Sequence, residues 1–141
     1  MRSWTFASSN EPIAGRSGFV RLSDDKNGFV RGDGVPLRFW GVNYSFKREI
    51  SPKELGHCAR FLAKLGVNLV RLGTDLESHA KNPGLTDTDP KNIEHAWRLV
   101  AAMKNEGIYT TISPYWAGAL KHALPGNAIY LVLSMQTFVK P

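Results

Sequence analysis

Hydrophobic and polar positions repeat one arrangement twice along this chain. In each copy a helix start signal precedes an apolar stripe at helical spacing, and a glycine and a β-branched strand follow. The first copy runs from Ser51 to Leu72, and the second runs from Asp89 to Ile112. Strands that alternate with helices are typical of an α/β fold with a parallel sheet, in which ligands bind at the carboxyl ends of the strands. The pattern therefore predicts the fold class and also the edge of the sheet where chemistry is expected.

Each predicted helix has a beginning and an end that the residues explain. Ser51 and Glu54 have the spacing of a capping box around Pro52, and Asp89 precedes Pro90 in the second helix. The glycine after each stripe supplies the left-handed residue that ends a helix. The side chains that we expect to be buried are Leu55, Cys58, Ala59, Leu62 and Leu65 in the first helix, and Ile93, Ala96, Trp97, Val100 and Met103 in the second.

The segments before the first helix predict a leader and a hairpin. Residues 1–17 are rich in Ser, Asn and Gly, and we expect a loose leader there. The Asp-Gly pair at positions 33–34 is typical of a tight turn, so residues 18–36 are predicted to form a β-hairpin. The stretch from Val35 to Val42 is interpreted as one continuous strand. Residues 18–141 would then form one domain, with the strands of its main sheet near 37–43, 67–72 and 108–113.

Composition and charge exclude several classes of function. The chain has 141 residues, of which 43% are hydrophobic, and its 18 basic and 12 acidic residues give a net charge of +6. The basic residues are dispersed and form no stripe, so a nucleic-acid partner is not expected. The four histidines and Cys58 show no metal-ligand spacing, and neither a metal nor a cofactor is expected.

No segment suggests a membrane or a targeting role. The longest apolar run, residues 128–133, is too short to span a bilayer, and residues 1–18 lack a signal-peptide pattern. A soluble protein is expected, and its compartment stays open.

Three stretches, in order, resemble the beginning of a known enzyme family. They are residues 28–43, with the run Arg38-Phe39-Trp40-Gly41-Val42-Asn43, residues 65–72, with Leu-Gly-Val-Asn-Leu-Val-Arg-Leu, and residues 106–109, with Glu-Gly-Ile-Tyr. Together they resemble the cellulase- and mannanase-like retaining glycoside hydrolases, which are built on a (β/α)8 barrel. The resemblance implies an N-terminal hairpin followed by the first three β/α units of such a barrel, which would be incomplete here because a full barrel needs about 250 residues.

The resemblance also implies where the chemistry lies. Retaining members carry an acid/base glutamate after an asparagine at the end of the fourth strand and a nucleophile glutamate on the seventh, and neither strand is recognisable here. The chain is thus expected to be an N-terminal fragment of an enzyme that hydrolyses O-glycosidic bonds of a poly- or oligosaccharide, and to be inactive alone. The motif Asn10-Glu11-Pro12 is similar to the acid/base motif, but it precedes the first strand and is not assigned that role.

The candidate site residues follow the predicted strands. Arg71 matches the family's arginine that hydrogen-bonds the nucleophile carboxylate, and we interpret it as a supporting residue. Polar and aromatic side chains at strand ends suit a sugar, because they offer donors to hydroxyls and flat apolar faces to the ring. Ordinary loop packing stays the alternative for each of them. The substrate-binding candidates are Asn43, Tyr44, Arg71, Asp75, Tyr115 and Trp116.

A second function class stays open beside the enzyme fragment. Three parallel strands leave an open edge and uncovered apolar surface. A non-catalytic carbohydrate-binding or degenerate half-barrel protein, folded by dimerisation or by docking to another chain, is the alternative. Self-association would then use the open edge of the sheet.

Overall fold

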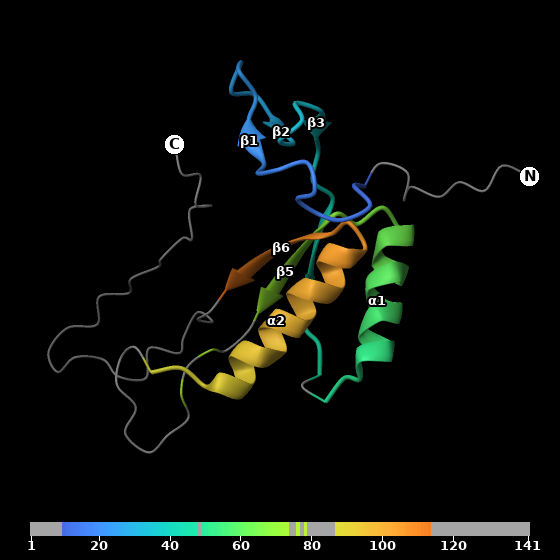
Figure 1. Cartoon of the computed structure of the whole chain (residues 1–141), viewed down its shortest axis with the longest axis vertical. Coiled ribbons are helices and arrows are strands. Elements are labelled where there is room, and N and C mark those ends of the chain that lie inside the picture. Colours follow the sequence, from blue (N-terminus) through green and yellow to red (C-terminus); the bar gives the residue numbers. More distant parts are fainter. Residues whose placement is uncertain (1–9, 48, 74–75, 77, 79–86, 114–141) are drawn as a thin grey trace, which may run out of the picture.

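The computed structural model describes residues 10–47, 49–73, 76, 78 and 87–113. These residues form an α/β structure with two sheets and two helices (Figure 1). The elements are β1 (Arg21–Leu22), β2 (Phe29–Val30), β3 (Pro36–Leu37), β4 (Gly41–Tyr44), α1 (Pro52–Lys64), β5 (Leu69–Gly73), α2 (Pro90–Asn105) and β6 (Tyr109–Ser113).

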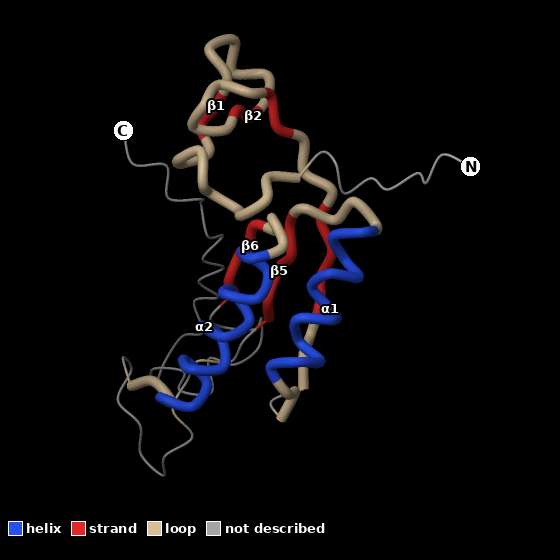
Figure 2. Tube along the Cα trace, turned by 45° about the vertical axis from the view of Figure 1, so that its right-hand side comes forward, coloured by secondary structure: helices blue, strands red, loops and turns tan. Residues whose placement is uncertain are grey.

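The larger sheet is parallel, in the order β4-β5-β6. Its register pairs Asn43 with Arg71, and Arg71 with Thr111. Helices α1 and α2 both lie on one face of this sheet (Figure 2). The parallel pairing predicted from the repeated helix–strand pattern is therefore confirmed.

The small sheet is antiparallel, in the order β1-β2-β3. It lies beyond the amino ends of β5 and β6, on the side away from which their arrows point (Figure 1). The predicted continuous strand from Val35 to Val42 contributes to both sheets. The structure divides that stretch, with β3 in the small sheet and β4 in the parallel one.

Asn68 explains this division. Its side chain is 6% exposed, its Nδ2 donates to the carbonyl of Arg38 at 2.7 Å, and its Oδ1 accepts from the backbone N–H of Trp40 at 2.7 Å. The amide thus satisfies backbone groups between β3 and β4 that would otherwise need a strand partner. The strand predicted from Val35 to Val42 is interrupted because the Asn68 side chain, and not a neighbouring strand, bonds the backbone of Arg38 and Trp40.

The helix ends agree with the sequence. Ser51 caps α1 in a complete capping box with Glu54, and the side chain of Asp89 caps α2 by accepting from the N–H of Lys91. Gly66 and Gly107 follow the two helices with φ of 82° and 74°, values that a residue with a Cβ adopts only under strain.

The core lies between the two helices and the sheet. Val70 and Leu72 of β5 are 0% and 1% exposed, and they pack beneath the helices. The buried stripes differ from the predicted ones at several positions. Leu65 and Trp97 are 54% and 66% exposed, whereas Leu99, which the predicted stripe omitted, is 2% exposed. The apolar stripes are wider than the helix surface that the described sheet covers.

Residues 10–17 also differ from the expected loose leader. Asn10 Nδ2 donates to the carbonyl of Val67 at 3.0 Å, and the N–H of Ala14 donates to the carbonyl of Lys104 at 2.9 Å. Glu11 and Ala14 are 4% and 7% exposed. This segment packs against the amino end of the parallel sheet because strand starts and helix ends leave backbone groups that need partners.

Candidate substrate-binding face

The face of the parallel sheet opposite the helices carries several polar side chains of β4, β5 and β6. Successive side chains of a strand point to opposite faces, so the burial of Val70 and Leu72 under the helices sends Arg71 to the other face. The register brings Asn43 and Thr111 beside Arg71 on that face. We call this set of side chains the inner face; its polar members are Asn43, Arg71, Thr111 and Ser113.

Arg71 is held in place on the inner face by a neighbouring strand. Its Nε donates to the Ser113 hydroxyl at 2.9 Å, and the side chain is exposed. A guanidinium presents several N–H groups in a fixed plane, and this geometry matches a carboxylate or a pair of hydroxyls. Ser113 is not among the residues predicted from the sequence; it lies on the face of Arg71 because it is two positions after Thr111, which pairs with Arg71 in the register.

Asn43 is the predicted site residue that the structure brings together with Arg71. The two are paired in register on adjacent strands, and Asn43 is exposed. Its amide offers one acceptor and two donors, which suits sugar hydroxyls.

Tyr44 lies elsewhere. It follows Asn43 directly, so its side chain turns to the helix-bearing side, where its ring lies 4.3 Å from that of Phe46. The structure therefore does not bring Tyr44 together with Asn43 and Arg71. The remaining substrate-binding candidates, Asp75, Tyr115 and Trp116, lie outside the described residues.

None of the three parallel strands carries a carboxylate. Their sequences are Gly-Val-Asn-Tyr, Leu-Val-Arg-Leu-Gly and Tyr-Thr-Thr-Ile-Ser. The inner face of the described strands can therefore bind and orient a polar ligand, but it offers no acid, base or nucleophile for glycoside hydrolysis.

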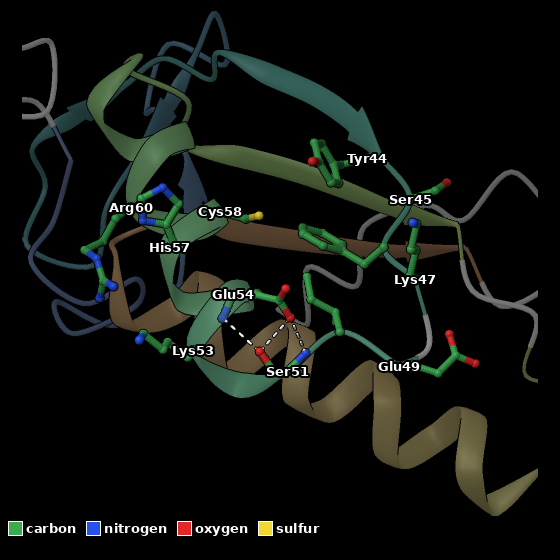
Figure 3. A pocket seen from close by; sticks show the side chains of 12 residues that line it. Tyr44, Ser45, Lys47, Glu49, Ser51, Lys53, Glu54, His57, Cys58 and Arg60 are labelled. Carbon is green, nitrogen blue, oxygen red and sulfur yellow. Dashed lines mark hydrogen bonds between the residues drawn. The ribbon is translucent and has the colours of Figure 1, made fainter.

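A hollow of about 960 Å³ lies on the helix-bearing side, between the segment that follows β4 and helix α1. Figure 3 shows Tyr44 entering it from β4, and Cys58 and His57 entering it from α1. Hydrogen bonds from Ser51 hold the pKa of Glu54, at its edge, below the usual range. The hollow and the inner face are separate places.

Glu11 lies at the amino end of the sheet, opposite the strand ends where ligands bind in this fold class. Its carboxylate accepts from the Tyr109 hydroxyl at 2.7 Å and from the N–H of Ser17 at 3.3 Å, and it lies 3.5 Å from Nε of Arg31. Burial, and then the hydrogen bond to Glu11, raises the pKa of Tyr109 to about 12. The Glu11 carboxylate therefore connects the 10–17 segment to the amino end of β6.

The described residues contain no cluster of metal ligands and no helix suited to crossing a membrane. No group of three or more His, Cys, Asp or Glu side chains gathers there in a way that could hold a metal ion. Neither of the described helices has the length and apolar composition needed to cross a bilayer.

Solved structures of glycoside hydrolases have a similar fold. One glycoside hydrolase superimposes with a TM-score of 0.59 at 13% sequence identity, covering 74% of this chain and 27% of that chain. A glycoside hydrolase of family 5 from Bacteroides vulgatus ATCC 8482 superimposes with a TM-score of 0.56 at 16% identity, covering 78% of this chain and 27% of that chain.

These comparisons confirm the predicted resemblance at the level of the fold. This chain spans 27% of the length of each neighbour, so it corresponds to part of a TIM barrel. No family model matches the sequence, and no curated protein matches it.

Proposed function

We propose that this chain is the N-terminal part of a retaining glycoside hydrolase that acts on O-glycosidic bonds of a poly- or oligosaccharide. The small sheet would be its N-terminal hairpin, and β4, β5 and β6 would be the first three barrel strands. The neighbours are glycoside hydrolases of low identity, and they support this proposal through the fold.

The observation that carries the proposal is the arrangement around Arg71. Its guanidinium is fixed by Ser113 on the face without helices, beside Asn43 and close to the carboxyl end of β5. In this proposal Arg71 donates to the nucleophile carboxylate and keeps it ionised, and Asn43 binds a substrate hydroxyl. Both are positions where a barrel of this class collects its ligands.

The catalytic glutamates lie beyond the described strands in this proposal. Retaining hydrolysis needs two carboxyl groups about 5 Å apart across the scissile bond. Because β4, β5 and β6 contain no acidic residue, the isolated 141-residue chain should turn over aryl glycosides at the background rate.

A sugar titration tests the proposal on the chain as it exists. Cello- and manno-oligosaccharides are added to the ¹⁵N-labelled chain, and we expect the largest chemical-shift changes at Asn43 and Arg71. Arg71→Met should weaken the interaction, whereas Arg16→Met, which alters an exposed arginine of the 10–17 segment, should leave it unchanged. Shifts that ignore Arg71→Met would contradict the assigned face.

The coding sequence provides the second test. Reading the DNA past the codon for Pro141 should reveal a strand that ends in Asn-Glu and a later strand that ends in Glu. A frame that continues without them would favour the alternative, a carbohydrate-binding half-barrel that binds sugar on the same face but does not cleave it.

A further inference from the structure

The turn that joins β1 to β2 carries a chemically reactive dipeptide. Asn27 is followed by Gly28, and this is the one Asn-Gly pair in the sequence. The turn lies at the end of the small sheet away from the helices (Figure 1), and Asn27 is exposed. A side-chain amide can be attacked by the next backbone nitrogen, and a following glycine has no Cβ to obstruct the approach. The pair is therefore a candidate site of deamidation.

The attacking nitrogen already has a partner that can take its proton. The N–H of Gly28 donates to Oγ of Ser23 at 3.0 Å. The Ser23 hydroxyl in turn donates to Oδ1 of Asp25, which is nearer to it than its other acceptor, the carbonyl of Gly28 at 3.2 Å. These groups form a continuous path for a proton from the Gly28 nitrogen to the Asp25 carboxylate.

The same carboxylate contacts the group that would leave. Oδ2 of Asp25 accepts from Nδ2 of Asn27 at 3.3 Å. Hydrogen bonds from the Ser23 hydroxyl, and then from the backbone N–H of Asn27, hold the pKa of Asp25 below its ordinary value, so this carboxylate is ionised at neutral pH. Asp25 thus contacts both ends of the reaction, the nucleophile through Ser23 and the leaving group directly.

We propose that Asn27 deamidates within the folded chain and that Asp25 carries the proton. The Gly28 nitrogen passes its proton through Ser23 to Asp25 and bonds to Cγ of Asn27. The bond between Cγ and Nδ2 then breaks, and the proton from Asp25 completes the ammonia that leaves. Water opens the resulting succinimide at one carbonyl to give aspartate, or at the other to give isoaspartate. This modification does not depend on the proposed function.

The product differs from the parent chain in charge and in backbone length. A carboxylate at position 27 faces that of Asp25 where the parent has a hydrogen bond, so the two charges repel each other. Isoaspartate also adds a methylene to the backbone of the turn. The N–H of Ser23 donates to the carbonyl of Gly28 at 2.9 Å across this turn. Deamidation should therefore weaken that bond and loosen the pairing of β1 with β2.

Ageing of the purified chain at neutral pH and body temperature tests the proposal. Peptide mapping by mass spectrometry follows the change from –NH₂ to –OH at position 27, and chromatography separates the aspartate and isoaspartate products. We expect both products to accumulate at this position. Asn105, which is exposed and followed by glutamate, should stay intact over the same period.

Substitutions test the proton path. Asp25→Ala and Ser23→Ala should each slow the loss of Asn27 by about tenfold or more, since a positioned proton carrier accelerates a reaction by at least that factor. Asp24→Ala is the matched control, because it removes an exposed carboxylate from the same turn, and it should leave the rate unchanged. Ser23→Thr keeps the hydroxyl and should keep the parent rate. A turn that merely opened would free the dipeptide, so slowing cannot come from loss of the turn.

The contrary outcomes are distinct. Persistence of Asn27 for as long as Asn105 would overturn the proposal. Equal or faster loss in Asp25→Ala would overturn it as well, because the carboxylate would then hold the turn closed and carry no proton. Hydrogen exchange tests the consequence, since the amide of Ser23 should exchange faster in the aged chain. An unchanged exchange rate there would overturn the loosening of the β1–β2 pair.

Discussion

Replacing Glu11 by alanine should destabilise this protein strongly, although the residue belongs to a segment that the sequence predicts to be loose. Glu11 is 4% exposed, and its carboxylate accepts from Tyr109 at 2.7 Å and from Ser17 at 3.3 Å. The substitution removes the acceptor for both donors and leaves a gap against β6. It also removes the charge that faces Arg31 at 3.5 Å.

The magnitude follows from these contacts. A hydrogen bond to a charged group contributes about 1.5–3 kcal/mol, and a buried donor left without a partner costs about 1–3 kcal/mol. Arg31 limits the loss, because its guanidinium keeps Asp33 at 2.8 Å and is not left unpaired. We therefore expect Glu11→Ala to lower the free energy of unfolding by about 2–4 kcal/mol, slightly less than for a fully buried ion pair.

Urea unfolding followed by tryptophan fluorescence measures this change. With a slope of about 1–3 kcal/mol per molar urea, the midpoint should fall by about 1–2 M. Glu94→Ala is the matched control, because Glu94 is an exposed acid on α2, and its removal should change the free energy of unfolding by less than about 0.5 kcal/mol. Tyr109→Phe is the milder variant, with an expected loss of about 1–2 kcal/mol.

The double variant tests whether the two side chains act on each other. Because they share one hydrogen bond, the combined loss should be smaller than the sum of the single losses by about 1–2 kcal/mol. A loss of unfolding free energy in Glu11→Ala no larger than in Glu94→Ala would refute the stabilising role of Glu11 at the amino end of the sheet. Strict additivity with Tyr109→Phe would refute it as well. Hydrolysis of a glycoside that disappears on Glu11→Gln would show instead that this carboxylate is catalytic.

Three further outcomes follow from the same geometry. Tyrosinate absorbance, compared with that of Tyr109→Phe, should show Tyr109 titrating at about pH 12, and its pKa should be lower in Glu11→Gln. Because this pKa rises from 10.0 to about 12 on folding, the stability that Tyr109 contributes is present below pH 10 and is lost as the pH rises towards 12. Asn68→Ala should cost about 2–4 kcal/mol in urea unfolding, because the carbonyl of Arg38 and the N–H of Trp40 lose their partner, and equal stability would contradict this assignment. Gly107→Ala should lower the free energy of unfolding by more than about 2 kcal/mol, because a Cβ there would collide with the backbone of Glu11. The control is Gly34→Ala, which has a similar φ of 82° and open space around it and should cost only about 1 kcal/mol. Equal losses would show that residues 10–17 do not pack as described.

Local signals in the sequence predicted the helices well. The capping box at Ser51 and the positive φ of Gly66 depend on residues a few positions apart, so the local sequence predicts where α1 begins and ends. The parallel order of the sheet follows from the same local pattern, because a strand–helix–strand unit has few ways to pack. The position of Arg71 on the inner face also follows once the partners of Val70 and Leu72 are known.

Contacts between distant residues were not predictable in this way. Glu11 and Tyr109 are 98 positions apart, and nothing near Glu11 indicates a buried partner. The side chain of Asn68 reaches Trp40 across 28 positions and thereby divides a stretch that reads as one strand. Tyr44 was assigned to the sugar site from its place at a strand end, yet alternation along β4 directs it to the helix side.

The apolar stripe of α1 is wider than the part of the helix that the described residues bury. Leu65 belongs to the stripe of α1 by spacing, but it is 54% exposed, while Leu55 in the same stripe is 2% exposed. A helix that contacts only a sheet needs a narrow apolar side, whereas a helix with neighbours on both flanks needs a wide one. Helix α2 contacts α1 near Arg60 and Glu106, which leaves the side of Phe61 and Leu65 uncovered among the described residues. The excess width therefore indicates a neighbour that the sequence of α1 already accommodates, and it indicates on which side that neighbour packs.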